Sequence, residues 1–239
     1  MGHLCFIDID NPAIRPPPPQ QQNIISGIKL DLLNWLIISV LYAMFFSWYT
    51  NLGGELSAEE IKFFLAQAEK NAELNNRPFS EDRYNRLKHF MEEDTGKQFI
   101  MVNNIDINEN PGFVEGAKEG DTADDLLNRY MEYMTPALLK RASHPIFMGY
   151  VVNSSMDVFG IENAETWDRA ALMRYKSRRV MMEIATNPVF FGKHEFKIEA
   201  MEKTIAYPVE PSFYLGDPRL LLFLILLSFG LILQIRSRD

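Results

Sequence analysis

The first candidates for acid–base or metal chemistry in this chain are His144 and His194. Neither has a second metal ligand four residues away, and the H-E-x-x-H pattern of zinc hydrolases is absent. The sequence also lacks a glycine-rich phosphate loop and the G-x-S-x-G turn that presents a nucleophilic serine. The single cysteine, Cys5, can form neither an intrachain disulfide nor a cysteine-rich metal cluster. The sequence therefore predicts no metal site, no cofactor and no assembled catalytic set.

Arginines cluster where a predicted strand passes directly into a helix. Arg174 precedes the junction and Arg178 follows it, while Ser177 is placed to cap the helix by accepting a hydrogen bond from a main-chain N–H. Cations at a helix N-terminus oppose the helix dipole unless an anion lies nearby. We expect Asp168 or Glu165 to supply that anion through ion pairs. The alternative is an external carboxylate or phosphate held by the arginines.

The elements that position these residues follow from hydrophobic periodicity. Two amphipathic helices come first, at 57–74, opened by the capping-box pair Ser57 and Glu60, and at 80–93. The pattern then predicts a strand at 98–107, a helix at 121–142, strands at 144–153 and 166–175, a helix at 177–202 broken at Asn187 and Pro188, and a strand at 203–209. This β-α-β-β-α-β order is the ferredoxin-like arrangement of an α+β domain.

Apolar residues occur on both faces of these strands, which predicts that both faces of the sheet are covered. Helices would cover one face, and the sheet of a second copy would cover the other. In the strand 166–175, Trp167 and Tyr175 share one face, and Leu172 lies on the opposite one. We assign the Leu172 face to the helices, which sends Trp167 and Tyr175 into the interior between two sheets. There, with Asn103 and Tyr150, they would either line a pocket for a small apolar molecule or fill the dimer core.

The stretch from Trp167 to Thr204 resembles the C-terminal half of the dimeric α+β barrel superfamily, in its uncharacterised, antibiotic-biosynthesis-monooxygenase-like branch. That strand typically reads W-D-x-x-x-L-x-R-Y-P-S-R, and the matching residues are Trp167, Asp168, Leu172, Arg174, Tyr175, Ser177 and Arg178. Lys176 replaces the usual proline. The segments "FIMVNNIDIN" and "YMEYMTPALL" resemble the first strand and helix, so the resemblance covers roughly residues 97–210.

The resemblance implies a fold and leaves the activity open. Members of the superfamily include cofactor-independent monooxygenases, haem-handling enzymes, isomerases and binding proteins, so fold does not fix function. By analogy alone, His194 is a candidate haem ligand or general base. Arg174 and Arg178 are candidate ligand-binding residues at the strand-to-helix junction.

Two apolar segments flank this domain and predict membrane spans. Residues 32–50 carry no charge, and at roughly 1.5 Å per residue they nearly cross a hydrocarbon core of about 30 Å, which places the first span at 28–50. The second span, 220–236, is shorter. Arg219 and Arg236 border it, and their long side chains can reach the headgroup region.

Two spans divide the chain into seven segments. They are a Pro-rich tail (1–27), the first span (28–50), a helical connector (51–96), the α+β domain (97–211), a linker (212–219), the second span (220–236) and a C-terminal tail (237–239). Both tails then lie on one side of the membrane. The basic residues of the tails, set against the acidic start of the connector, place the tails in the cytoplasm and the domain outside, in a bacterial inner membrane.

Net charge and composition restrict the classes of binding partner to be expected. The formal net charge is −8, and the acidic excess lies between the spans, so the domain is a poor nucleic-acid binder. The proline run at residues 11–22 predicts an extended segment, either a stiff spacer or a docking ligand for a partner.

The function predicted from the sequence is that of a membrane-anchored accessory subunit. Two anchors around one small domain without a catalytic set suggest a module that dimerises or assembles a membrane complex, so the expected partners are the lipid bilayer and a second copy or another subunit. The alternative is a small-molecule-binding protein, or a cofactor-independent or haem-dependent oxidoreductase, that uses the barrel interior.

Overall fold

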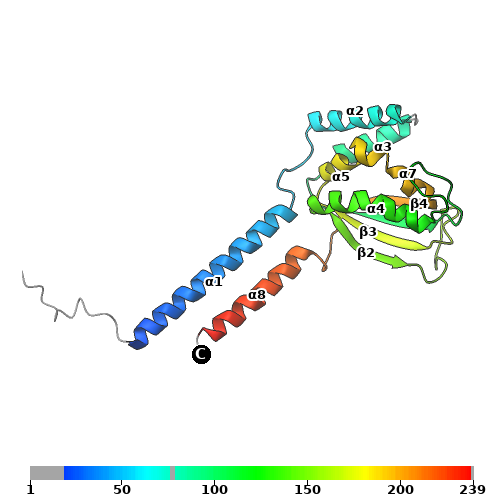
Figure 1. The fold of residues 1–239 in the computed structure, drawn as a ribbon. Coiled ribbons are helices and arrows are strands. Elements are labelled where there is room, and N and C mark those ends of the chain that lie inside the picture. Colours follow the sequence, from blue (N-terminus) through cyan, green and yellow to red (C-terminus); the bar gives the residue numbers. More distant parts are fainter. Residues whose placement is uncertain (1–18, 76–78, 238–239) are drawn as a thin grey trace, which may run out of the picture. The chain divides into compact units, whose positions relative to one another are not determined.

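The computed structural model describes residues 19–75 and 79–237 of the chain (Figure 1). Two of the segments expected from the sequence fall partly outside the described residues: residues 1–18 of the Pro-rich tail and residues 238–239 of the C-terminal tail.

The chain forms two compact units. One unit contains the first helix up to Phe46 together with the chain from Asp217 onward. The other unit runs from Ser47 to Gly216 and contains the whole sheet.

The first unit is built from two long apolar helices, α1 (Pro19–Tyr49), which continues three residues beyond this unit, and α8 (Pro218–Arg236). Gly27–Tyr49 and Pro218–Arg236 are each long and apolar enough to cross a membrane, close to the bounds expected from the sequence, and only 6% of the most apolar part of each is buried. A core helix of a soluble protein would bury its apolar side chains, whereas these remain exposed on most sides. Helix α1 begins at Pro19, so Gln20–Gln22 are helical and not extended as expected. Proline suits the first position of a helix because its missing N–H is not needed there.

Helices α1 and α8 pack against each other in antiparallel directions. Near one end, Ser237 Oγ donates a hydrogen bond to Asp31 Oδ1 at 2.6 Å. In the middle, a Cβ added to the buried Gly230 would lie 2.6 Å from Cη2 of Trp35. The absence of a side chain at Gly230 therefore lets the two helices approach closely, as small residues do in membrane helix pairs.

The second unit is a mixed α+β structure. Its elements in chain order are α2 (Ala58–Leu74), α3 (Glu81–Glu92), β1 (Phe99–Ile107), α4 (Ala123–Lys140), β2 (His144–Tyr150), β3 (Arg169–Tyr175), α5 (Arg178–Ala185), α6 (Pro188–Phe191), α7 (His194–Glu199) and β4 (Met201–Val209). The four strands form one sheet in the order β2-β3-β1-β4, and every neighbouring pair is antiparallel. The α+β class expected from the sequence is confirmed.

Local capping fixes where the helices begin. The Ser57 hydroxyl accepts a hydrogen bond from the Glu60 N–H at 3.2 Å, and the Glu60 carboxylate accepts one from the Ser57 N–H at 2.9 Å, which confirms the predicted capping box of α2. Ser177 caps α5 as predicted, because its hydroxyl accepts from the Val180 N–H at 3.2 Å. The chain also breaks at Asn187 and Pro188, between α5 and α6.

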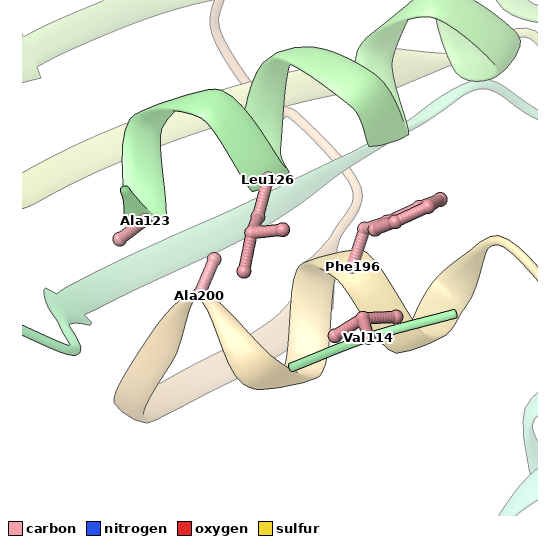
Figure 2. Packing of buried hydrophobic residues seen from close by; sticks show 5 residues of the cluster. All are labelled: Val114, Ala123, Leu126, Phe196 and Ala200. Atoms are coloured by element: carbon pink, nitrogen blue, oxygen red, sulfur yellow. The ribbon is translucent and has the colours of Figure 1, made fainter. Parts of the chain in front are cut away.

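One hydrophobic cluster joins α4 to α7. Figure 2 shows Ala123 and Leu126 of α4 facing Phe196 of α7 and Ala200, with Val114 of the preceding loop beside them. Leu126 is 1% exposed and Phe196 2% exposed, so this contact is a fully formed core. It holds α7 at a fixed distance from α4, which matters because both helices contribute side chains to the cavity described below.

A second cluster shows which face of the sheet the helices cover. Met173 and Tyr175 of β3 pack against buried side chains of α4 and α5, among them Leu138 and Ile184. The helices therefore cover the Tyr175 face, and the assignment of the Leu172 face to the helices is wrong. The long side chains of Met173 and Tyr175 fill space between sheet and helices that small side chains would leave empty.

The opposite face of the sheet is exposed and partly apolar. Strand register places Phe147 of β2 opposite Leu172, and Tyr207 and Val209 of β4 beside the residues of β1 that share this face. The exposed fractions are 52% for Phe147, 45% for Tyr207 and 39% for Val209. We call this surface the open sheet face, defined by Phe147, Ile205, Tyr207 and Val209.

Candidate ligand-binding cavity

A cavity of about 540 Å³ lies between the sheet and the helices of the second unit. Its volume falls within the range of roughly 300–1,000 Å³ that is usual for small-molecule sites. All four strands contribute to one wall, and α4, α5 and α7 supply much of the other. Alternating side chains of β1 and β3 reach it because the helix-facing residues of adjacent strands lie next to each other in register.

Methionine dominates the lining of this cavity. Eight of the twelve methionines in the chain border it, namely Met101, Met131, Met134, Met148, Met173, Met181, Met182 and Met201. Methionine is unbranched and polarisable, so a methionine-lined wall can adapt to ligands of different shapes. The wall is suited to an apolar molecule.

Three polar side chains of the apolar lining have pKa values shifted by burial toward their neutral forms. Burial raises the pKa of Tyr175 to about 12, and burial, with a smaller contribution from Tyr175, also raises the pKa of Tyr130. Burial lowers the pKa of the Lys197 amine. All three residues keep intermediate solvent exposure because they border the cavity. Within the described part of the chain, none of their side-chain polar atoms has a hydrogen-bond partner.

Aromatic contacts fix the two tyrosines. The Tyr175 ring stacks on Phe99 of β1 with the centroids 5.2 Å apart and the planes 8° apart. The Tyr130 ring meets the His194 ring edge to face at 6.1 Å. Both rings are held by neighbours on one side, so their hydroxyl groups keep a defined position at the cavity wall.

An ion pair lies at another part of the lining. Arg169 Nη1 of β3 lies 2.6 Å from Asp124 Oδ1 of α4. The Arg169 guanidinium also lies 5.3 Å from the centroid of the Tyr150 ring. The hydrogen bond from Arg169 lowers the pKa of Asp124, so this carboxylate stays ionised and paired. Among the described residues, Arg169 Nε is buried without a hydrogen-bond partner.

The structure brings together four of the seven residues proposed from the sequence as ligand-binding. Those that line the cavity are Asn103, Tyr150, Tyr175 and His194. Asn103 uses its amide to donate to the carbonyls of Met101 and Ala171 at 3.0 and 3.3 Å. These residues meet on the helix side of the sheet and not in an interior between two sheets.

Trp167 lies away from the cavity. It precedes β3, its indole N–H donates to the Ala164 carbonyl at 3.0 Å, and the Lys203 amine lies 5.0 Å from the centroid of its ring. The regular strand begins only at Arg169, so Trp167 lies outside it, and its predicted position between two sheets stays a prediction.

The two remaining candidates are structural arginines. Arg174 is fully buried, and its Nε donates to Gln98 Oε1 at 2.7 Å. Arg178 donates to the Phe90 carbonyl at 2.6 Å and to Glu210 at 3.0 Å, beside an open groove of about 870 Å³ between α3 and β4. Ion pairs hold the junction as expected.

The anions at this junction are not the ones predicted. Glu210 pairs with Arg178 and Glu60 pairs with Arg179, at 3.0 and 2.6 Å, in place of Asp168 and Glu165. Asp168 instead accepts a hydrogen bond from the Ile107 N–H at 2.7 Å. Arg178 Nε also lies 3.8 Å from Asp94 Oδ1. All three observed partners come from segments distant in sequence, which local spacing could not reveal.

Sequence reasoning missed Lys197, Tyr130 and Arg169 as cavity residues. Lys197 occurs in an otherwise ordinary amphipathic stretch, between Phe196 and Ile198, where a lysine normally faces water. The high methionine content is the one sequence signal that could have indicated an adaptable apolar cavity. No group of three or more metal-ligating side chains occurs among the described residues.

No protein-family model matches the chain, and the search of curated proteins finds no match. Among solved structures, RPA0582, a protein of unknown function from Rhodopseudomonas palustris, matches with 14% identity and a TM-score of 0.46, over 57% of this chain and 97% of that one. A methylated form of RPA0582 matches with 16% identity and a TM-score of 0.46, over 59% of this chain and 96% of that one.

Proposed function

We propose that this chain is a membrane-anchored protein whose sheet-containing unit binds a small, largely apolar molecule in the methionine-lined cavity. The observation that carries the proposal is the combination of a cavity of about 540 Å³ with three unpartnered polar groups, on Tyr130, Tyr175 and Lys197, in its apolar lining. A few polar groups in an apolar cavity are the usual means of orienting a small ligand. We propose binding at this site and assign no reaction to it.

We also propose that the second unit is a ferredoxin-like domain of the dimeric α+β barrel type. The β2-β3-β1-β4 strand order and the antiparallel pairing support this proposal, as does the chain order of one helix after β1 and further helices after β3. The sequence resemblance around Trp167–Arg178 supports it independently.

The two exposed apolar helices support a two-pass membrane protein with both tails on one side. Their antiparallel contact, with Asp31 of α1 beside Ser237 of α8, is the geometry that such a hairpin needs. The tails are proposed to be cytoplasmic and the second unit extracytoplasmic. Protease added to intact cells should digest residues 51–216, and protection of these residues until lysis would reverse the orientation.

The binding proposal can be tested with the full chain in lipid nanodiscs. Organic extraction and mass spectrometry should find a small molecule enriched over empty nanodiscs. Ala171→Phe would place a ring in the cavity from β3 and should remove that molecule, whereas Leu172→Phe on the opposite face should retain it. Equal content in both variants would reject the cavity as the site. A Soret band in the purified protein would instead favour the haem-dependent alternative.

A second candidate function is assembly through the open sheet face. Ile205, Tyr207 and Val209 expose 39–45% of their surfaces on the edge strand β4, and a second sheet is the natural cover for such a surface. On this proposal the protein is a homodimer or an accessory subunit of a membrane complex.

The assembly proposal is tested by oligomeric state. Tyr207→Glu would place a charge on the open sheet face and should convert a dimer in nanodiscs or mild detergent into a monomer. Glu202→Gln, also on β4, serves as a control that should keep the dimer. A wild-type chain that is monomeric at all concentrations tested would reject self-association.

A further inference from the structure

Lys197 is a cation without a compensating anion in the cavity. It lies on α7 (His194–Glu199) and borders the cavity together with His194 of the same helix. Its amine makes no hydrogen bond or ion pair with any residue within 19–75 and 79–237. Holding an ammonium ion in an apolar wall is unfavourable, and burial correspondingly lowers the pKa of Lys197.

The other charged groups of the lining do not compensate Lys197. Asp124 is the one carboxylate among the described lining residues, and it is paired with Arg169 at 2.6 Å. The remaining ionisable lining residues carry guanidinium, phenol or imidazole groups and no carboxylate, namely Arg83, Tyr130, Tyr150, Tyr175 and His194. A bound anion would therefore be the first negative charge available to Lys197.

Two further polar groups of the same lining, the hydroxyls of Tyr130 and Tyr175, are also donors. The raised pKa values of Tyr130 and Tyr175 keep both phenols protonated at neutral pH, so each offers an O–H to an acceptor. The Asn103 amide N–H groups are already engaged with main-chain carbonyls. The Lys197 amine and the two tyrosine hydroxyls are thus free donors that a strong hydrogen-bond acceptor would satisfy.

We propose that the cavity ligand is an amphiphile with one anionic head group, of the carboxylate class, held by Lys197 and by the hydroxyls of Tyr130 and Tyr175, with its apolar part among the methionines. This inference rests on the proposed binding function and adds the chemical class of the ligand. Charge-assisted hydrogen bonds from an ammonium to a carboxylate are among the strongest polar contacts in proteins, and a low-dielectric wall strengthens them.

The test uses two photoreactive probes with the full chain in phosphatidylcholine nanodiscs. One is decanoic acid with a diazirine in mid-chain, and the other is decanol with the same diazirine. Tryptic mass spectrometry locates the cross-links. We expect the acid to label peptides that contain cavity methionines, with labelling removed by excess unlabelled decanoate, and the alcohol to label them at least tenfold less at equal concentration.

Substitutions of Lys197 distinguish the effect of its charge on labelling from the effect of its side-chain packing. Lys197→Met should lower labelling by the acid at least tenfold and bring it to the level of the alcohol, whereas Lys197→Arg should retain most of it. The thermal midpoint of Lys197→Met should not fall, because this change removes an uncompensated buried cation. Tyr133→Phe, a change on α4 outside the cavity lining, is the matched control and should label as wild type does.

The possible outcomes distinguish the two proposals. Equal labelling of the cavity by acid and alcohol, unchanged in Lys197→Met, would overturn the anionic head group and leave apolar binding intact. Absence of cavity labelling by both probes would count against the binding function itself. Acid labelling confined to α1 and α8 would show membrane partitioning only and would also overturn the inference.

Discussion

The guanidinium of Arg174 lies 3.6 Å from the centroid of the Tyr49 ring, and its Nη2 donates to the Tyr49 carbonyl at 2.9 Å. Tyr49 is the last residue of α1 and belongs to the same compact unit as β3, so the buried Arg174 supplies a donor to a carbonyl at this helix C-terminus. Lys176 adds a hydrogen bond to the Trp48 carbonyl at 2.6 Å. The Tyr49 hydroxyl is in turn 2.8 Å from His144 Nε2.

Loss of Arg174 should therefore destabilise the second unit strongly. Arg174→Met would leave the acceptors on Gln98, Ala142 and Tyr49 without this donor and should cost about 3–5 kcal/mol of unfolding free energy. Urea unfolding followed by tryptophan fluorescence measures the loss. Arg141→Gln, which breaks the exposed pair with Glu183, should cost about 1 kcal/mol or less. Similar losses in the two variants would contradict the anchoring role of Arg174.

Glu60 should contribute stability that depends on pH. The hydrogen bond from Arg179 lowers the pKa of Glu60 from its ordinary value of 4.5 to about 2. Because the folded-state pKa is depressed, this contribution is complete above about pH 4.5 and is lost as the pH falls toward 2. Glu60→Gln should therefore lower stability at pH 7 by about 1 kcal/mol, since the side chain is 38% exposed, and by almost nothing near pH 2.

Thermal unfolding across this pH range provides the check. Glutamine can keep the capping hydrogen bond at the third helical position, so the substitution removes mainly the charge. Glu59→Gln, one residue earlier, is the control for a general change in charge. A penalty for Glu60→Gln that is the same at pH 2 and pH 7 would show that the ion pair with Arg179 is not its cause.

Gly230 should govern the pairing of α1 and α8. Gly230→Leu would place a side chain where a Cβ alone approaches Trp35 to 2.6 Å, and the two helices should separate. A Cys5→Ser, Asp31→Cys, Ser237→Cys protein reports the pairing, because the wild-type side chains at 31 and 237 are in hydrogen-bond contact. Its disulfide yield should fall severalfold with Gly230→Leu and stay constant with Leu231→Phe, which enlarges an exposed residue. An unchanged yield in Gly230→Leu would contradict close packing.

Truncating two aromatic side chains to alanine should reduce the unfolding free energy by different amounts, because one side chain is more buried than the other. Phe196 is 2% exposed and packs in the cluster between α4 and α7, so Phe196→Ala should cost about 3–5 kcal/mol. Trp167→Ala removes a partly exposed ring and one hydrogen bond to Ala164, and should cost about 1–2 kcal/mol. Chemical denaturation of the full chain in nanodiscs ranks the two. A larger loss for Trp167→Ala would support the inward position between two sheets that the sequence suggested for it.

The sequence by itself determined the features that depend on neighbours along the chain. Ser57 and Glu60 begin α2 through a capping box, and Ser177 begins α5, because these hydrogen bonds close within one turn. The two apolar helices follow from length and composition alone. The strand at Phe99–Ile107 follows from the change of hydrophobic period.

Only the tertiary structure decided which face of the sheet meets the helices. Strand β3 carries apolar residues on both sides, so a period of two leaves two assignments that local pattern cannot separate. The packing of Met173 and Tyr175 against α4 and α5 selects one of them and moves the cavity to the helix side. Lys197 belongs to the cavity for the same reason. Its sequence resembles that of a solvated helix face, and the contact between α7 and α4, made by residues about seventy positions apart, turns it toward an apolar wall.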